Sequence, residues 1–200
     1  MKDQIANLFR ATPVFMVLGS LLVSGVLTME SSLANPAART ALLCAIWGII
    51  GDVTAAALKR YVFLPLYTWS GSDMWPIIGL VRRPPGAKNC GAWPYAWGAG
   101  NSKSDKEQTV FSGLGMPSGH SVHMFTVFSF LLGIITKSPH PVGSAWWGTL
   151  ILLGVVSTSV AISRVVLGCH TWQQVLMGST LGGIGGWMAS DVSSKIIWHS

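Results

Sequence analysis

Apolar stretches of about 20 residues dominate this sequence, and they restrict the fold more than any other feature. Such stretches cover about residues 11–29, 40–58, 61–81, 118–136, 143–162 and 172–190. A helix needs roughly 20 apolar residues to cross the hydrocarbon core of a bilayer. Only 10% of the 200 residues are charged, whereas soluble domains carry about 25%. The sequence therefore predicts an all-α membrane bundle of about six transmembrane helices, formed by one domain over residues 1–200.

Polar stretches between the runs indicate where the chain turns. Residues 30–39 are typical of a connecting loop. Lys59 and Arg60 follow the second run, and we expect them to anchor the end of that helix at the membrane surface. Residues 82–116 form the one long polar stretch, which predicts a long loop.

Six crossings place both termini at one membrane face. They bring the 82–116 loop and a short polar junction at 163–171 together at the other face. Five basic side chains from distant parts of the sequence then share one surface: Arg82, Arg83, His120, Arg164 and His170.

A glycine-rich turn at 115–121 leads directly into the fourth apolar run. Pro117 suits a first helical turn, Ser118 offers a capping oxygen, and Gly119 lets the backbone approach a ligand. The free N–H groups and the positive dipole end of such a helix bind anions such as phosphate. His120 lies within reach of that anion and titrates near neutral pH.

Two imidazoles and two or three guanidinium groups at one water-facing pocket suit phosphoryl transfer. Arginine binds phosphate oxygens through paired, charge-assisted hydrogen bonds and remains ionised at every relevant pH. One imidazole can attack phosphorus, while the other protonates the leaving oxygen and then activates water. No carboxylate cluster or Cys/His ligand set lies near these positions in the sequence, so this interpretation requires neither a metal ion nor another cofactor.

These residues resemble the motifs of the type 2 phosphatidic acid phosphatases. The sequence Pro-Ser-Gly-His at 117–120 resembles the second motif of that family. Ser163-Arg164, followed after five residues by His170, resembles the third motif, and Arg83 with the proline after it resembles the end of the first.

The resemblance implies a role for each matching residue. His170 would be the nucleophile that forms a phosphohistidine, and His120 would be the general acid for the departing alcohol. The phosphate oxygens would be held by Arg83, Arg164, Ser118 and the Gly119 amide. The active site of the family is similar to that of vanadium-dependent haloperoxidases, and the family works without a metal.

The chain departs from the first motif, which normally begins with a lysine seven positions before its arginine. That position holds Pro76 relative to Arg83, or Trp75 relative to Arg82. The phosphate therefore lacks one expected cation, unless Arg82 or Lys88 replaces it.

A second departure concerns the aspartate that normally lies four residues after the histidine of the third motif. Gln174 holds that position here. Residues four apart share one face of a helix, so Gln174 can accept a hydrogen bond from the far ring nitrogen of His170. A Gln174→Asp variant is expected to retain or raise turnover on this basis.

The predicted function is hydrolysis of a phosphomonoester or diphosphate on a membrane lipid: phosphatidic acid, a related lipid phosphate or a polyprenyl diphosphate. One alternative is an inactive protein that binds lipid phosphates. Another is a transporter or channel, with a path lined by Asp52 and the glycine-rich run at 178–186. The net charge is +6, but the basic residues are scattered, which speaks against a nucleic-acid partner.

Three further features bear on structure and location. Asp52, inside an apolar run, is expected to make a buried structural hydrogen bond. Cys90 and Cys169 lie in polar loops and can pair if their side of the membrane is oxidising, whereas Cys44 is a small core residue. The face with the termini carries Lys2, Arg10, Lys59, Arg60, Lys137 and Lys195. We therefore expect this face to lie in the cytoplasm and the pocket to lie on the extracytoplasmic or lumenal side.

Overall fold

The structure is a computed structural model that describes residues 2–31, 35–72, 74–75, 79–87, 90 and 113–198. Its elements, in chain order, are α1 (Lys2–Ser31), α2 (Pro36–Leu58), η1 (Lys59–Phe63), α3 (Leu64–Ser70), β1 (Met74–Trp75), β2 (Gly79–Leu80), α5 (Gly119–Thr136), α6 (Ser144–Val166) and α7 (Trp172–Trp198). Three helical segments are long and apolar enough to cross a membrane: Pro36–Ser70, Gly119–Thr136 and Ser144–Val166. The predicted all-α membrane bundle is confirmed.

The second helical segment is longer than predicted. It begins at Pro36, where the Asn35 side chain caps the helix by accepting a hydrogen bond from the Ala37 N–H. The π-helical turn η1 joins α2 directly to α3, so the separation of helices at 40–58 and 61–81 is wrong. The helix ends only at Gly71, whose φ of 61° is a left-handed conformation that glycine adopts without strain.

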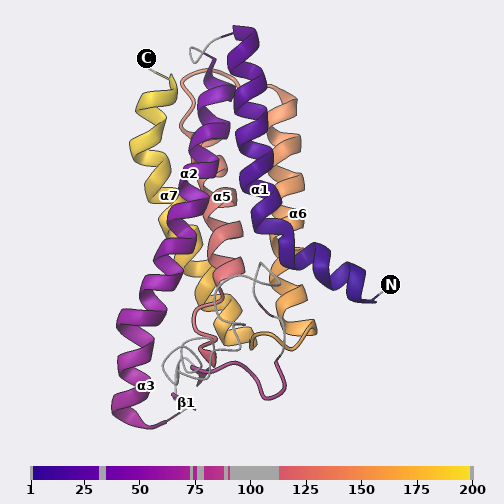
Figure 1. Ribbon diagram of the computed structural model, residues 1–200. Helices are drawn as coiled ribbons and strands as arrows, with labels where there is room; N and C mark the ends of the chain where they lie inside the picture. Colours follow the sequence, from indigo (N-terminus) through magenta and orange to yellow (C-terminus); the bar gives the residue numbers. More distant parts are fainter. Residues whose placement is uncertain are drawn as a thin grey trace.

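This continuity changes where the chain ends lie. The described residues form five long helical segments instead of six, and successive segments run in opposite directions. Figure 1 shows the C-terminal end of α7 at the top, with the N-terminal end of α1 toward the lower right. The expectation that both termini share one face is therefore wrong for the described chain.

Helix α5 lies at the centre of the bundle and packs against α2, α6 and α7 (Figure 1). The contact with α7 is the closest, because glycines spaced four residues apart face the α5 backbone. A Cβ at Gly182 or Gly186 would overlap a carbonyl oxygen of α5, and a Cβ at Gly178 would overlap that of its N-cap residue Ser118. Gly183 and Gly185 have no such neighbour within 4 Å, so only part of the predicted glycine-rich contact is used.

Helices α2 and α5 are joined by a polar contact inside the bundle. The Asp52 carboxylate lies 2.9 Å from Nδ1 of His123. The His123 side chain is fully buried, but the Asp52 side chain is 50% exposed. The predicted hydrogen bond of Asp52 is therefore present, while its predicted burial is wrong. The sequence did not indicate the partner, which lies 71 residues away.

Candidate active site

Three segments that are distant in sequence meet at the end of the bundle where α5 and α7 begin. Arg83 N donates to Gly113 O at 2.8 Å, and Gly115 N donates to Val81 O at 2.9 Å. Ser118 N donates to Gln174 O at 3.1 Å. Backbone hydrogen bonds thus join the segment before α5 both to the Arg83 segment and to the first turn of α7.

Gln174 holds the His170 ring through a fixed amide. Its Nε2 donates to the carbonyl oxygens of Leu80 and Arg82, both at 2.7 Å. Its Oε1 therefore faces the other way, 3.0 Å from Nδ1 of His170, and also accepts from the Thr171 N–H at 3.2 Å. An acceptor at Nδ1 places the proton of the neutral ring there, so the lone pair lies on Nε2.

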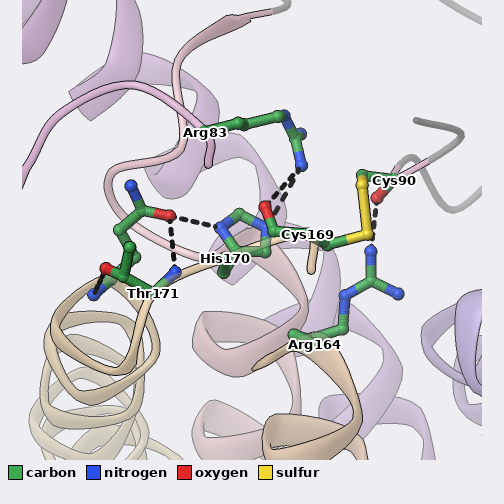
Figure 2. Close-up of a disulfide and its surroundings, with 7 residues drawn as sticks. Arg83, Cys90, Arg164, Cys169, His170 and Thr171 are labelled. Carbon is green, nitrogen blue, oxygen red and sulfur yellow. Dashed lines mark hydrogen bonds between the residues drawn. A yellow bond between two sulfur atoms is a disulfide. The ribbon is translucent and has the colours of Figure 1, made fainter. Parts of the chain in front are cut away.

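Arg83 lies beside that second ring nitrogen. One terminal guanidinium nitrogen is 3.4 Å from Nε2 of His170 and also 3.4 Å from the carbonyl oxygen of Cys169 (Figure 2). The same residue lines a pocket of about 490 Å³ between the 80–87 segment and Gly113. Arg83 thus connects the surface of the site with the ring of His170.

In Figure 2, Arg164 lies below the Cys169–His170 backbone, on the side opposite Arg83. Its side chain is fully buried in the last turn of α6, and it donates to the carbonyl oxygen of Cys90 at 2.7 Å. The backbone N–H groups of Cys169 and His170 both donate to the Arg164 carbonyl oxygen. Gly168, at φ 66°, allows the tight reversal that these bonds require. Arg164 and His170 are therefore held at a fixed spacing.

A disulfide joins Cys90 to Cys169, next to His170 (Figure 2). This is the pairing that the sequence left conditional on an oxidising compartment. Cys44 remains a free, buried thiol, as predicted. The disulfide ties the segment after Arg83 to the junction that carries His170.

The start of α5 differs from the prediction in two details. The helix begins at Gly119 with Ser118 as its N-cap residue, so Pro117 lies before the first turn. The Ser118 hydroxyl makes no capping hydrogen bond, and it accepts instead from the Ser121 hydroxyl at 3.1 Å. His120 is buried in the first turn, and Gly119 meets only the Ala55 Cβ, at 4.0 Å from an added Cβ.

The electrostatics of the site keep His170 neutral. Burial lowers the pKa of His170 well below its ordinary value, and the positive charges of Lys59, Arg83, Arg164 and His120 lower this pKa further. A neutral imidazole has the free lone pair that a nucleophile needs.

Of the two cations considered as replacements in the first motif, Arg82 is described and Lys88 lies outside the described residues. Arg82 is exposed, and its guanidinium carbon lies 5.7 Å from the ring centre of Tyr67. Lys59, which the sequence predicts as a membrane anchor, lies close enough to the site for its charge to lower the pKa of His170. A lysine at the end of an apolar run is typical of an anchor, so the sequence did not indicate this proximity.

Among the described residues there is no group of three or more His, Cys, Asp or Glu side chains that could hold a metal ion. The arrangement offers partly or fully buried cations around a neutral imidazole, which suits an anionic substrate.

Comparison with known families agrees with this geometry. The family model described as the PAP2 superfamily matches residues 77–198, more than half of the chain. The chain belongs to the PAP2 superfamily.

Curated relatives point in the same direction. The chain is 30% identical to dolichyldiphosphatase 1 of Homo sapiens over 155 residues, which are 71% of this chain and 58% of that protein. It is 38% identical to dolichyldiphosphatase 1 of Rhinolophus ferrumequinum over 149 residues, which are 68% of this chain and 55% of that protein. The chain thus spans somewhat more than half the length of these relatives. No solved structure gives a significant match.

Proposed function

We propose that this protein hydrolyses a phosphomonoester or diphosphate carried by a membrane lipid, through a phosphohistidine at His170. The observation that carries the proposal is the pair of contacts on the His170 ring. Gln174 accepts from Nδ1, and the Arg83 guanidinium lies 3.4 Å from Nε2. The ring is thus oriented with its lone pair toward a cation that binds phosphate.

In the first step, the Nε2 lone pair attacks phosphorus and the bond to the leaving oxygen breaks. His120 gives its proton to that oxygen, so the lipid leaves as a neutral alcohol or its phosphate leaves protonated. In the second step, His120 takes a proton from water, and the resulting hydroxide attacks the phosphohistidine. Inorganic phosphate is then released, and the free His170 ring is restored. Arg83 and Arg164 stabilise the charge that gathers on the phosphoryl oxygens.

A lipid substrate is favoured over a soluble phosphate because the site lies at the end of apolar helices. The curated relatives are named dolichyldiphosphatase, which favours a polyprenyl diphosphate among the lipid candidates. Phosphatidic acid remains the second substrate to compare, because the contacts described at His170 involve the phosphate-binding groups and not the lipid chain.

We place the site on the extracytoplasmic or lumenal side of a multi-pass bundle. The Cys90–Cys169 disulfide supports this placement, because disulfides persist in oxidising compartments. The turn between α5 and α6 then faces the cytoplasm. A His140→Cys variant, exposed in that turn, should react with a membrane-impermeant maleimide only after the membrane is opened. Labelling in intact cells would reverse the orientation.

The function is tested with the purified full chain in detergent, with EDTA present. Polyprenyl diphosphate and phosphatidic acid should both be assayed for phosphate release. His170→Ala should abolish release and should lose the labelled phosphoenzyme, whereas His140→Ala, far from the site, should match the wild type. Wild-type rates in His170→Ala would refute the mechanism.

The same assay separates the alternatives. Lipid-phosphate binding without turnover in the wild type would identify an inactive binding protein. Loss of all activity in EDTA, restored by a divalent ion, would contradict the metal-free mechanism. Ion-dependent flux in vesicles, without phosphate release, would favour a transporter.

A further inference from the structure

An apolar groove lies between α1, α2, α5 and α6, in the half of the bundle away from the active site. Its volume is about 480 Å³, which is within the range of pockets that hold small molecules. The small residues Gly19, Ala41 and Ala145 leave room on three of these helices. Val127 and Leu131 form the wall on α5, and the described lining contains no charged residue. The groove therefore suits an uncharged, apolar ligand.

The surroundings of the groove favour a hydrocarbon chain as this ligand. The hydroxyl groups of Thr40 and Thr149, which belong to the lining, donate to carbonyl oxygens of their own helices at 2.8 and 2.9 Å. They therefore need no polar partner in the groove. Phe15 and Leu152 line it and are more than half exposed, so the groove opens at the outer surface of the bundle. Because α2, α5 and α6 contain the candidate membrane spans, this surface faces lipid.

The groove and the active site lie along one seam between α2 and α5. Gly48 of α2 lies against Val127 of the lining, whose side chain would be 3.3 Å from an added Cβ. Ala55, about two turns farther along α2, lies beside Gly119 at the start of α5. His120, the proposed general acid, is the next residue. The seam therefore leads from the groove to the site.

Distances along the helices determine how long a chain must be to reach the groove from the site. Val127 is eight residues after Gly119, so at about 1.5 Å per residue the lining on α5 begins roughly 12 Å from the site. On α6 the lining extends from Val156 to Ala145, which adds roughly 16 Å. The acyl chains of one leaflet extend roughly 15 Å, half the thickness of the hydrocarbon core. Such a chain reaches only the near end of the groove, whereas a long polyprenyl chain can fill it.

We propose that this groove binds the distal part of the hydrocarbon chain of a polyprenyl diphosphate. This placement rests on the proposed function, which puts the diphosphate beside His170. It adds a second binding site for the same substrate, in the membrane half away from the reacting group. The chain then contributes to specificity, because only long chains contact the far part of the groove.

The experiment compares a short and a long diphosphate, with the purified full chain in mixed detergent micelles. Geranyl diphosphate has a chain that ends before the groove, and undecaprenyl diphosphate has a chain that extends past it. Gly19→Leu and Ala41→Leu place a larger side chain in the groove. Gly148→Leu is the matched control, because Gly148 is exposed on α6 outside the lining and, like Gly19, would meet no atom within 4 Å of an added Cβ. Each protein is measured for kcat/KM on both diphosphates.

The wild type and Gly148→Leu should prefer undecaprenyl diphosphate by roughly 3- to 10-fold in kcat/KM. The preference is modest because the chain moves between two apolar environments and gains only packing contacts. Gly19→Leu and Ala41→Leu should lose this preference while geranyl diphosphate is hydrolysed at the wild-type rate, which also shows that both variants fold. A wild type without chain-length preference, or a preference that both groove variants retain, would overturn the inference.

A second measurement locates the chain without any groove substitution. Undecaprenyl diphosphate with a diazirine near the end of its chain is bound to the His170→Ala protein, which should not hydrolyse it, and is then irradiated. Crosslinks should form at lining residues such as Phe15 and Leu152, and excess unlabelled undecaprenyl diphosphate should remove them. Crosslinks found instead on the lipid-facing side of α7, for example at the exposed Ile184, would overturn the inference. So would a phospholipid that remains in the groove when undecaprenyl diphosphate is in excess, because the occupant would then be a bilayer lipid.

The outcomes also separate this inference from the proposed function. Hydrolysis of both diphosphates with equal kcat/KM in every variant would keep the function and remove the inference. Crosslinks of the chain to the groove, in a wild-type protein that hydrolyses neither diphosphate, would support the binding site and remove the function.

Discussion

His170 combines an oriented ring with a lowered proton affinity. Gln174 fixes the orientation, and burial with four neighbouring cations lowers the pKa of the imidazole well below its usual range. The neutral form is the active form in the proposed mechanism. A lowered pKa therefore extends activity toward acid pH.

We expect the acid limb of kcat/KM to have its midpoint well below about 6.5, the ordinary pKa of histidine. The sign follows from the direction of the shift: protonation of His170 stops catalysis, and the surrounding positive charges postpone that protonation to lower pH. Removal of one such charge in Lys59→Met should move the midpoint upward. A pH–rate profile from pH 4 to 8 measures both effects, and a wild-type midpoint above 6.5 would contradict the first.

Gln174 does more than replace an aspartate. Its amide N–H groups bind two backbone carbonyls of the segment that carries Arg83, both at 2.7 Å. An aspartate has a shorter side chain and no N–H group, so it cannot make these bonds. The structure thus reverses the expectation that Gln174→Asp retains turnover.

We predict that Gln174→Asp lowers kcat/KM and destabilises the fold by about 1–3 kcal/mol, the cost of leaving buried carbonyls unpaired. Thermal unfolding and lipid hydrolysis measure the two effects. Gln173→Asp, at an exposed neighbouring position, serves as the control. Turnover at or above the wild-type level in Gln174→Asp would show that the amide donors are dispensable.

At the scale of elements, the α5–α7 contact sets the position of both imidazoles. His120 lies in the first turn of α5, and His170 lies two residues before the first residue of α7. Glycines at 178, 182 and 186 let the two helix backbones approach closely. The distance between His120 and His170 therefore depends on this close helix contact, which the glycines permit because they have no side chain.

A Gly182→Ala substitution should separate these helices, because its Cβ would overlap the Val122 carbonyl oxygen. We expect a destabilisation of about 1–3 kcal/mol, typical of overpacking, together with reduced turnover. Gly185→Ala has no neighbour within 4 Å, and should be neutral or stabilising by up to about 1 kcal/mol. Unfolding midpoints of the two variants give the comparison, and equal midpoints would contradict the close-contact argument.

At the scale of the whole molecule, the disulfide closes the chain around the site. Cys90 and Cys169 are 79 residues apart in sequence. Between them lie the whole of α5 and α6. The bond therefore holds the segment after Arg83 close to the end of α6, where Arg164 donates to the Cys90 carbonyl oxygen.

Cys90→Ser, Cys169→Ser or treatment with a reductant should lower stability by about 2–4 kcal/mol and reduce turnover. Thiol titration of the unfolded, unreduced chain should find one free thiol, Cys44, out of three cysteines. A Cys44→Ala variant should keep the sensitivity to reductant. Three free thiols in the freshly purified protein would show that the disulfide is absent. The argument that the site faces an oxidising compartment would then lose its support.

The sequence alone determined the fold class and the family to which the chain belongs. Apolar run length is a direct consequence of bilayer thickness, so the helical bundle was predictable. The motifs around His120, Arg164 and His170 were identified because their residue types and spacing resemble those of a known family. Helix α5 was predicted at 118–136 and is found at Gly119–Thr136.

Only the tertiary structure decided which side chains surround His170 and how they are oriented. Lys59 is typical of a membrane anchor by sequence, but the fold brings its charge close enough to lower the pKa of His170. The orientation of the Gln174 amide, like the partner of Asp52, depends on groups more than 70 residues away. The physical reason is that local sequence determines helix formation, whereas the relative position of two helices depends on contacts between residues distant in sequence.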